Sequence, residues 1–533
     1  MKHKIYRIVC TALCCAPLLA TAQTGGKITS PQQLYEEGES LFRQKAFAAA
    51  MPPLQAFIKQ TDAEGAPVSA AGNKEEAEYM LVCAEYELRT PNSIELLREY
   101  LDTYPDTPHA NRICALIASA YFFEGKYDDA LAMFNSSRLD LLSNEERDDM
   151  TYRLATCYLK TGNVKEAAIW FETLRSTGSR YTADCTYYLA YIRYSQQRYD
   201  DALNGFLSLQ ENAKYEALVP YYIAEIYLIK KNYDKAEIVA QNYLSAYPNQ
   251  KYTGEMYRIQ GTADYHFGEY HEAIKAFGSY LKDNAEPAPR RDALYMLGMS
   301  YYRTGVYSQV PVTLGEVTAN KDALTQNAYL HMGLAYLQLA DKNKARMAFE
   351  QAAASDADLK IKEQASYNNA LCIHETSYSA FGESVTVFEN FLNEFPNSAY
   401  ADKVSSYLIE VYMNTRSYDA ALKSIERITH PGRAILEAKQ KILFQLGTQS
   451  FANTQFEQAI GCFNQSIALG GYNLQTKADA LYWRGESYYR LNRMQEAARN
   501  FNDYLSLTPQ KNTEMYALAY YCLLYTSDAA DDR

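Results

Sequence analysis

The chain has 533 residues, a hydrophobic fraction of 48% and a net charge of −12 at pH 7. This length is too great for one compact core, so we expect several domains or one array of repeats. The hydrophobic fraction excludes a disordered chain, and the negative charge argues against a general nucleic-acid binder, which needs a basic surface.

The first 22 residues have the pattern of a secretory signal peptide. Lys2, Lys4 and Arg7 form a positive start, a mostly apolar run covers residues 8–19, and residues 20–22 form a small-x-small cleavage site. A membrane anchor is the weaker alternative, because a span needs about 20 apolar residues and this run is shorter. The sequence therefore predicts export and cleavage, with no membrane span in the mature chain.

An internal repeat dominates the mature chain. A small residue, usually Ala, lies three residues after an aromatic and four before another apolar residue, as in Tyr127-Ala130-Phe134. Thirteen such anchors follow one another with gaps of 34 to 43 residues. The anchors are Ala50, Ser93, Ala130, Ala167, Ala202, Ala236, Ala273, Val310, Ala345, Ser384, Ala421, Ala459 and Ala497, of which those near Ser93 and Ser384 are degenerate. The first gap is the longest, and we expect a loop insertion at residues 65–73.

Each repeat is predicted to be a pair of helices. A second small residue lies twelve positions before most anchors, as Gly298 does before Val310. Small residues let two helices cross closely, and the aromatics fill the adjoining space. Glycine can end a helix in the left-handed conformation, and such turns are expected at Gly125, Gly162, Gly268 and Gly305.

The order of small, aromatic, alanine, aromatic and proline positions resembles the tetratricopeptide repeat, over roughly residues 34–521. The resemblance implies an all-α fold: a right-handed α-solenoid of about thirteen antiparallel helix pairs across residues 23–521, with the first helices lining a concave groove. Units of about 37 residues, longer than the usual 34, and closings such as Tyr104-Pro105 look like those of periplasmic members. Those members include outer-membrane assembly lipoproteins and Tol–Pal-associated proteins. The expected location is therefore the periplasm of a Gram-negative-type bacterium, in a complex at the outer membrane or cell wall.

Aromatic residues, with 49 Tyr among them, recur in two registers that by the family's geometry tend toward the groove or its floor. The candidate partner-binding residues are Tyr187, Tyr221, Tyr295 and Tyr482, fifteen residues before their anchors, and Phe122, Tyr194, Tyr265, Tyr302 and Tyr489, eight residues before theirs. Tyr gives a large contact area at little cost in entropy and carries a polar tip. The alternative is that these rings pack between the helices.

Motifs that carry chemistry are missing from the sequence. It has no P-loop, Rossmann glycine fingerprint, HExxH or GxSxG. His266 and His271 are five residues apart and so do not share a helix face. We therefore expect no catalytic residue, cofactor or metal, and a scaffold or adaptor in the periplasm or cell envelope that binds other proteins or peptides. The alternative is the N-terminal repeat region of a larger envelope enzyme, sensor or cell-wall-binding protein.

Six cysteines of the repeat region are widely and irregularly spaced, without a CxxC pair. A disulfide framework would be denser, so buried thiols are expected. A disulfide between Cys157 and Cys185 and a functional thiol remain as alternatives.

Residues 522–533 do not continue the repeat pattern. The transposase end sequence used in sequencing libraries encodes the six residues from Cys522 to Ser527, and the continuation of that adapter matches the next five. We expect this tail to be adapter read-through, with the native protein continuing past Tyr521. A genuine polar C-terminus is the alternative.

Overall fold

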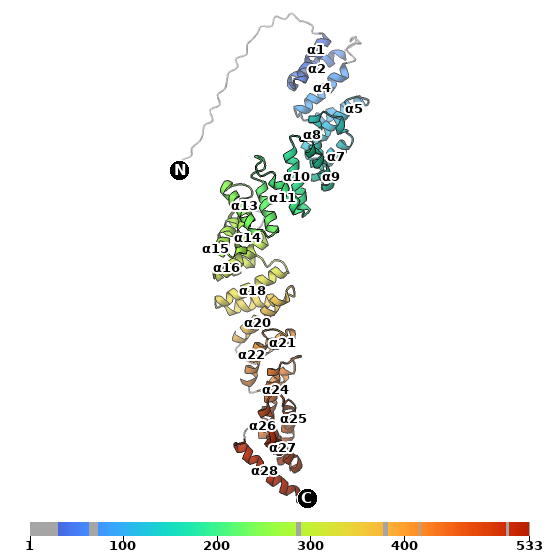
Figure 1. Cartoon of the computed structure of the whole chain (residues 1–533). Coiled ribbons are helices and arrows are strands. Elements are labelled where there is room, and N and C mark those ends of the chain that lie inside the picture. The colour runs from blue at the N-terminus through green and yellow to red at the C-terminus, as the bar shows by residue number, and fades with distance from the viewer. Residues whose placement is uncertain are drawn as a thin grey trace, which may run out of the picture. The chain divides into compact units, whose positions relative to one another are not determined.

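The computed structural model describes residues 30–62, 73–283, 289–376, 382–414, 417–507 and 511–531. These residues form α-helices, two short 3-10 helices and no strand (Figure 1). The predicted signal peptide and residues 65–72 of the predicted insertion lie outside the described residues. The chain divides into two compact units, Met1–Val219 and Pro220–Arg533. The fold is an all-α solenoid.

The first unit is built from helix pairs that follow one another along the chain. Its helices are α1 (Pro31–Arg43), α2 (Phe47–Thr61), α4 (Lys74–Glu87), α5 (Ser93–Thr103), α6 (Ala110–Phe123), α7 (Tyr127–Asn135), η1 (Leu139–Leu141), α8 (Asn144–Lys160), α9 (Val164–Ser176), α10 (Thr182–Ser195) and α11 (Tyr199–Leu207). The two helices of a pair pack on each other, and the first helices of successive pairs also touch: α4 contacts α6, and α6 contacts α8.

The second unit continues the same plan. Its helices are α12 (Val219–Ile229), α13 (Tyr233–Ala246), α14 (Thr253–Phe267), α15 (Tyr270–Asp283), α16 (Arg291–Arg303), η2 (Tyr307–Gln309), α17 (Val310–Gly315), α18 (Ala323–Gln338), α19 (Lys342–Ala353), α20 (Leu359–Thr376), α21 (Glu383–Glu394), α22 (Ala401–Asn414), α23 (Tyr418–Ile425), α24 (Arg433–Ala452), α25 (Phe456–Ala468), α26 (Leu474–Arg490), α27 (Met494–Leu507) and α28 (Glu514–Asp531). None of the described helices is both long and apolar enough to cross a bilayer.

All thirteen anchor residues lie in the second helix of a pair, and all are buried. Eleven of them are Ala or Val with no exposed surface, because the neighbouring helix crosses at these points. Several second helices begin at the aromatic residue three positions before the anchor, as α11 does at Tyr199 and α15 at Tyr270. The repeat in the sequence is thus a repeat of close helix crossings.

The turn between the two helices of a pair also repeats. In most pairs, a residue in the turn that follows the first helix has a positive φ. In four pairs this residue is a glycine with a φ of 76° to 83°, namely Gly125, Gly162, Gly268 and Gly305. Other pairs place a residue with a side chain at the same point, as with Arg89, Gln197 and Thr454. The left-handed turn is therefore a property of the helix pair, which tertiary packing imposes even where glycine is absent.

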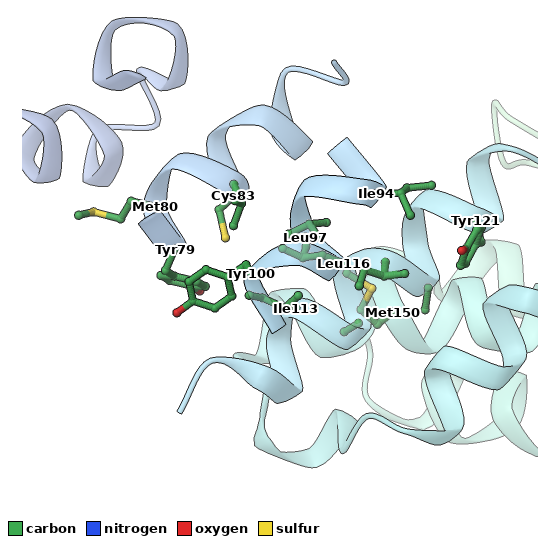
Figure 2. Packing of buried hydrophobic residues seen from close by; sticks show 14 of the residues in the cluster. Tyr79, Met80, Cys83, Ile94, Leu97, Tyr100, Ile113, Leu116, Tyr121 and Met150 are labelled. Atoms are coloured by element: carbon green, nitrogen blue, oxygen red, sulfur yellow. The ribbon is translucent and has the colours of Figure 1, made fainter. Parts of the chain in front are cut away.

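Buried side chains from neighbouring pairs merge into shared clusters. Figure 2 shows part of the first one, in which Cys83 of α4, Leu97 of α5, Leu116 of α6 and Met150 of α8 are buried together. Each pair therefore buries its apolar face against the next pair, as a solenoid requires.

Candidate functional site

The aromatic residues predicted eight positions before the anchors lie near the end of the first helix and contact the start of the second helix of the same pair. Phe122, Tyr194, Tyr265 and Tyr302 are half-buried, and each makes an edge contact with the aromatic residue five positions later. Those partners are Tyr127, Tyr199, Tyr270 and Tyr307, with ring centroids 5.7 to 6.1 Å away. We call these contacts the hairpin clasps. The fifth residue of this register, Tyr489, is half-buried beside the cluster that contains Phe501.

Two of the aromatic residues predicted fifteen positions before the anchors stack on a ring that follows their own helix pair. Tyr187 stacks on Tyr215 at 4.9 Å, and Tyr221 stacks on Tyr252 at 4.5 Å. In both contacts the second ring belongs to the segment that leads into the next first helix. The stack of Tyr221 on Tyr252 therefore joins two successive pairs of the second unit.

The other two residues of that register are also packed. Tyr295 is half-buried beside the cluster that contains Val310, and burial raises its pKa to about 12. Tyr482 is 5% exposed and packs against Phe501 and Tyr504. The nine predicted residues thus have packing partners, and eight of them are half-buried.

An exposed aromatic that the sequence analysis did not select lies one residue after Phe122. Phe123, the last residue of α6, is 52% exposed. The Arg89 and Arg153 guanidinium carbons lie over its ring, 4.8 and 4.9 Å from the centroid. The sequence carried only a weak signal for it: at the position seven before the anchor, several other repeats have a polar residue, among them Lys160, Ser195, His266, Arg303 and Arg490, but two others have Tyr86 and Ile229.

Phe123 forms one wall of a cavity of about 430 Å³, which we call the Phe123 pocket. It is lined by the end of α4, the turn from α4 to α5, the start of α5, the second half of α6 and the middle of α8. The pocket therefore involves the first helices of three successive pairs and one second helix. Its apolar lining includes Ile94, Leu116 and Met150, which are labelled in Figure 2. These three are at most 9% exposed and hold the floor in place.

Hydrogen bonds to the buried Ser119 hydroxyl connect two side chains of the pocket, Tyr86 and Arg153. Ser119 has no exposed surface, and its hydroxyl accepts a hydrogen bond of 2.8 Å from the Tyr86 hydroxyl and another from the Arg153 guanidinium. Burial raises the pKa of Tyr86, so this hydroxyl stays protonated and can donate. The Arg153 side chain is therefore held from three sides: by Ser119, by the Phe123 ring and by Asp149 at 3.9 Å.

Neither metal chemistry nor a reactive thiol gains support from the described residues. They contain no group of three or more His, Cys, Asp or Glu side chains that could hold a metal ion. Cys157 and Cys185 are free and buried, and burial raises the pKa of each thiol to about 12. His266 stacks on Tyr233 at 4.1 Å, which accounts for one of the two neighbouring histidines.

Comparisons with known proteins identify the repeat. One tetratricopeptide repeat family model matches residues 115–181, 260–308 and 444–512, and a second matches residues 326–359. A search of curated proteins finds no match.

Similar solved structures include three proteins of low sequence identity. A tetratricopeptide repeat protein from Parabacteroides merdae is 16% identical, over 49% of this chain and 99% of that one, with a TM-score of 0.33. The C-terminal part of a TPR repeat-containing protein from Cytophaga hutchinsonii is 16% identical, over 47% of this chain and 97% of that one, with a TM-score of 0.34. The Cut9–Hcn1 hetero-tetramer of the APC/C matches at 12% identity, over 94% of this chain and 96% of that one, with a TM-score of 0.27. From the family matches and the helix pairs together, we conclude that the chain is a tetratricopeptide-repeat protein.

Proposed function

We propose that the chain is an exported scaffold that binds other proteins across the first helices of its repeats, in the periplasm or cell envelope. The observation that carries the proposal is the Phe123 pocket, where three successive first helices leave a large aromatic ring half exposed. Exposed aromatic and arginine side chains over a rigid apolar floor are typical of the centres of protein interfaces.

The tetratricopeptide fold supports this type of activity, since it typically serves as a scaffold without catalysis. Export is supported by the signal-like residues 1–22, and an envelope role by the resemblance of the longer repeats to periplasmic assembly proteins. We include the half-buried tyrosines of both units in the proposal, with the exposed part of each side chain as a further contact for a partner.

Affinity capture tests the binding function. The full chain, expressed with its own N-terminus, would be purified from the envelope fraction after brief cross-linking, and co-purifying proteins identified by mass spectrometry. We expect a reproducible set of partners, whose yield falls at least fivefold in a Phe123→Ala variant that keeps its circular dichroism spectrum. Recovery of the same set from Phe123→Ala, at equal yield per folded molecule, would contradict the proposal.

Two further measurements test the parts that concern location and tyrosines. N-terminal sequencing of the mature protein should begin at Gln23, and an intact Met1 in the cytoplasmic fraction would contradict export. The double variant Tyr194→Ala, Tyr302→Ala should lower capture per folded molecule. If only its stability falls, these rings serve packing alone.

A further inference from the structure

Some charged side chains of the Phe123 pocket have a partner of opposite charge and others have none. Three of its carboxylates form ion pairs with cations other than the two arginines over the Phe123 ring. These pairs are Glu146 with Arg112 at 2.7 Å, Glu124 with Lys126 at 2.9 Å, and Asp149 with Arg180. Asp149 also accepts a hydrogen bond of 3.0 Å from the Tyr181 hydroxyl. These acids are therefore largely neutralised by their own neighbours.

Arg89 is the opposite case. Its side chain is exposed, and among the described residues it forms no ion pair; its guanidinium carbon lies over the Phe123 ring. Glu87, two residues earlier, lines the same pocket but does not come within ion-pair distance of it. A guanidinium carries five donors arranged to grip a carboxylate, and this one has no carboxylate to grip.

Two cations on one aromatic ring repel each other, and the electron-rich ring offsets that repulsion only in part. Arg153 cannot turn away, because Ser119 and Asp149 fix its head. Arg89 follows the end of α4, and its side chain is exposed and has no ion pair among the described residues. The arrangement thus places two guanidinium groups beside an apolar floor, and the Arg89 group, which is exposed and has no ion pair among the described residues, can bind an anionic group.

We propose that the Phe123 pocket binds an acidic side chain of a partner protein, with the carboxylate on the Arg89 guanidinium and an adjacent apolar side chain of the partner against the exposed part of the Phe123 ring. This inference rests on the proposed scaffold function and names the partner's chemistry: an exposed segment in which Asp or Glu alternates with apolar residues. Charge-assisted hydrogen bonds from guanidinium to carboxylate supply the selectivity, and burial of the exposed ring supplies apolar contact.

Blocked peptides test the inference directly. The probe is a fluorescein-labelled decapeptide of alternating Glu and Leu, acetylated and amidated so that only side-chain carboxylates are offered. Its binding to the full chain is followed by fluorescence anisotropy, beside matched Gln–Leu and Lys–Leu peptides. The Glu–Leu peptide should bind at least tenfold more tightly than the Gln–Leu peptide, and more weakly as salt rises from 50 to 300 mM.

The variants identify the pocket as the binding site. Arg89→Gln should weaken Glu–Leu binding about tenfold, the usual worth of a charge-assisted contact. The substitution is mild for the fold, since Gln197 occupies the same left-handed turn position in another pair. Arg198→Gln is the matched control, because Arg198 is exposed at a similar turn but already pairs with Asp201 at 2.6 Å, and it should leave binding unchanged.

Equal binding of the Glu–Leu and Gln–Leu peptides, preference for the Lys–Leu peptide, absence of Glu–Leu binding, or an unchanged Arg89→Gln variant would each overturn the inference. Capture experiments separate this failure from that of the scaffold itself. If wild type and Arg89→Gln retain the same partners at equal yield, the acidic site is wrong and the scaffold stands. If the wild type retains none, the proposed function fails.

Discussion

The backbone of Gly333 in α18 lies directly against the ring of Phe349 in α19: a Cβ atom built on Gly333 would be 2.5 Å from Phe349 Cε1. Phe349 has no exposed surface and stands four residues after the anchor Ala345. The same relationship recurs between Gly447 and Phe463, also at 2.5 Å. The small residue twelve positions before the anchor therefore leaves the space that the later aromatic ring fills.

Gly333→Ala should consequently destabilise the pair α18–α19. Overpacking of this kind costs about 1–3 kcal/mol, because the ring or the helix must move. Hydrogen exchange of the two helices reports the local effect, which suits a repeat array whose pairs are stabilised mainly by their neighbours. Gly278→Ala in α15 is the control: nothing lies within 4 Å of its added Cβ, so it should stabilise its helix by about 0.5–1 kcal/mol. Protection that falls equally in both variants would contradict this account.

The left-handed turns give a second prediction. Thr454, between α24 and α25, has a φ of 60°, which is costly for a β-branched residue. Thr454→Gly should stabilise this pair by about 1 kcal/mol, the penalty of that conformation for an L-residue. The reverse change, Gly162→Thr at a φ of 83°, should destabilise its pair by a similar amount. Urea unfolding and hydrogen exchange of the four helices would show both shifts, and shifts of the same sign would exclude the explanation.

A buried carboxylate makes stability depend on pH. Asp264 in α14 is 2% exposed, and its Oδ2 has no hydrogen-bond partner among the described residues. Burial raises the pKa of Asp264 to about 7, with the nearby Glu237, Glu269 and Glu272 adding to the effect. Because the folded pKa lies above the ordinary value of 3.8, the folded state binds the proton more tightly. Stability is then lost as the pH rises from about 4 to 7, with a slope of up to about 1.4 kcal/mol per pH unit.

Asp264→Asn mimics the protonated side chain and removes this titration. Thermal unfolding should show the variant above the wild type at pH 8, with the difference shrinking toward pH 5. Asp200→Asn, an exposed acid of α11, serves as the control for the change in net charge. A difference between wild type and Asp264→Asn that is constant across this pH range would show that Asp264 does not titrate as described.

Much of this architecture could be predicted from local pattern, because each helix pair repeats the same contacts within about 16 residues. The closeness of Gly333 and Phe349 is visible in the sequence as a small residue followed sixteen positions later by an aromatic. The turn at Thr454 was not predictable from composition, since tertiary packing forces the left-handed conformation on a residue that disfavours it. The Phe123 pocket was missed for a different reason: Arg89, Phe123 and Arg153 belong to three successive pairs, and no single repeat contains the site.

The hairpin clasps allow a measurement of how much a candidate binding residue contributes to the stability of its helix pair. Tyr265 of α14 and Tyr270 of α15 contact edge to face at 5.8 Å across the turn at Gly268. Such aromatic pairs contribute about 0.5–1.5 kcal/mol beyond their buried area. A double-mutant cycle with Tyr265→Leu and Tyr270→Leu, followed by hydrogen exchange in α14 and α15, should give a coupling energy in this range. Leucine keeps most of the apolar volume, so the cycle isolates the ring contact from a cavity. A coupling near zero would mean that the contact between the two rings contributes little to the stability of the helix pair. Tyr265 would then have another role, and contact with a partner protein is the role that we propose.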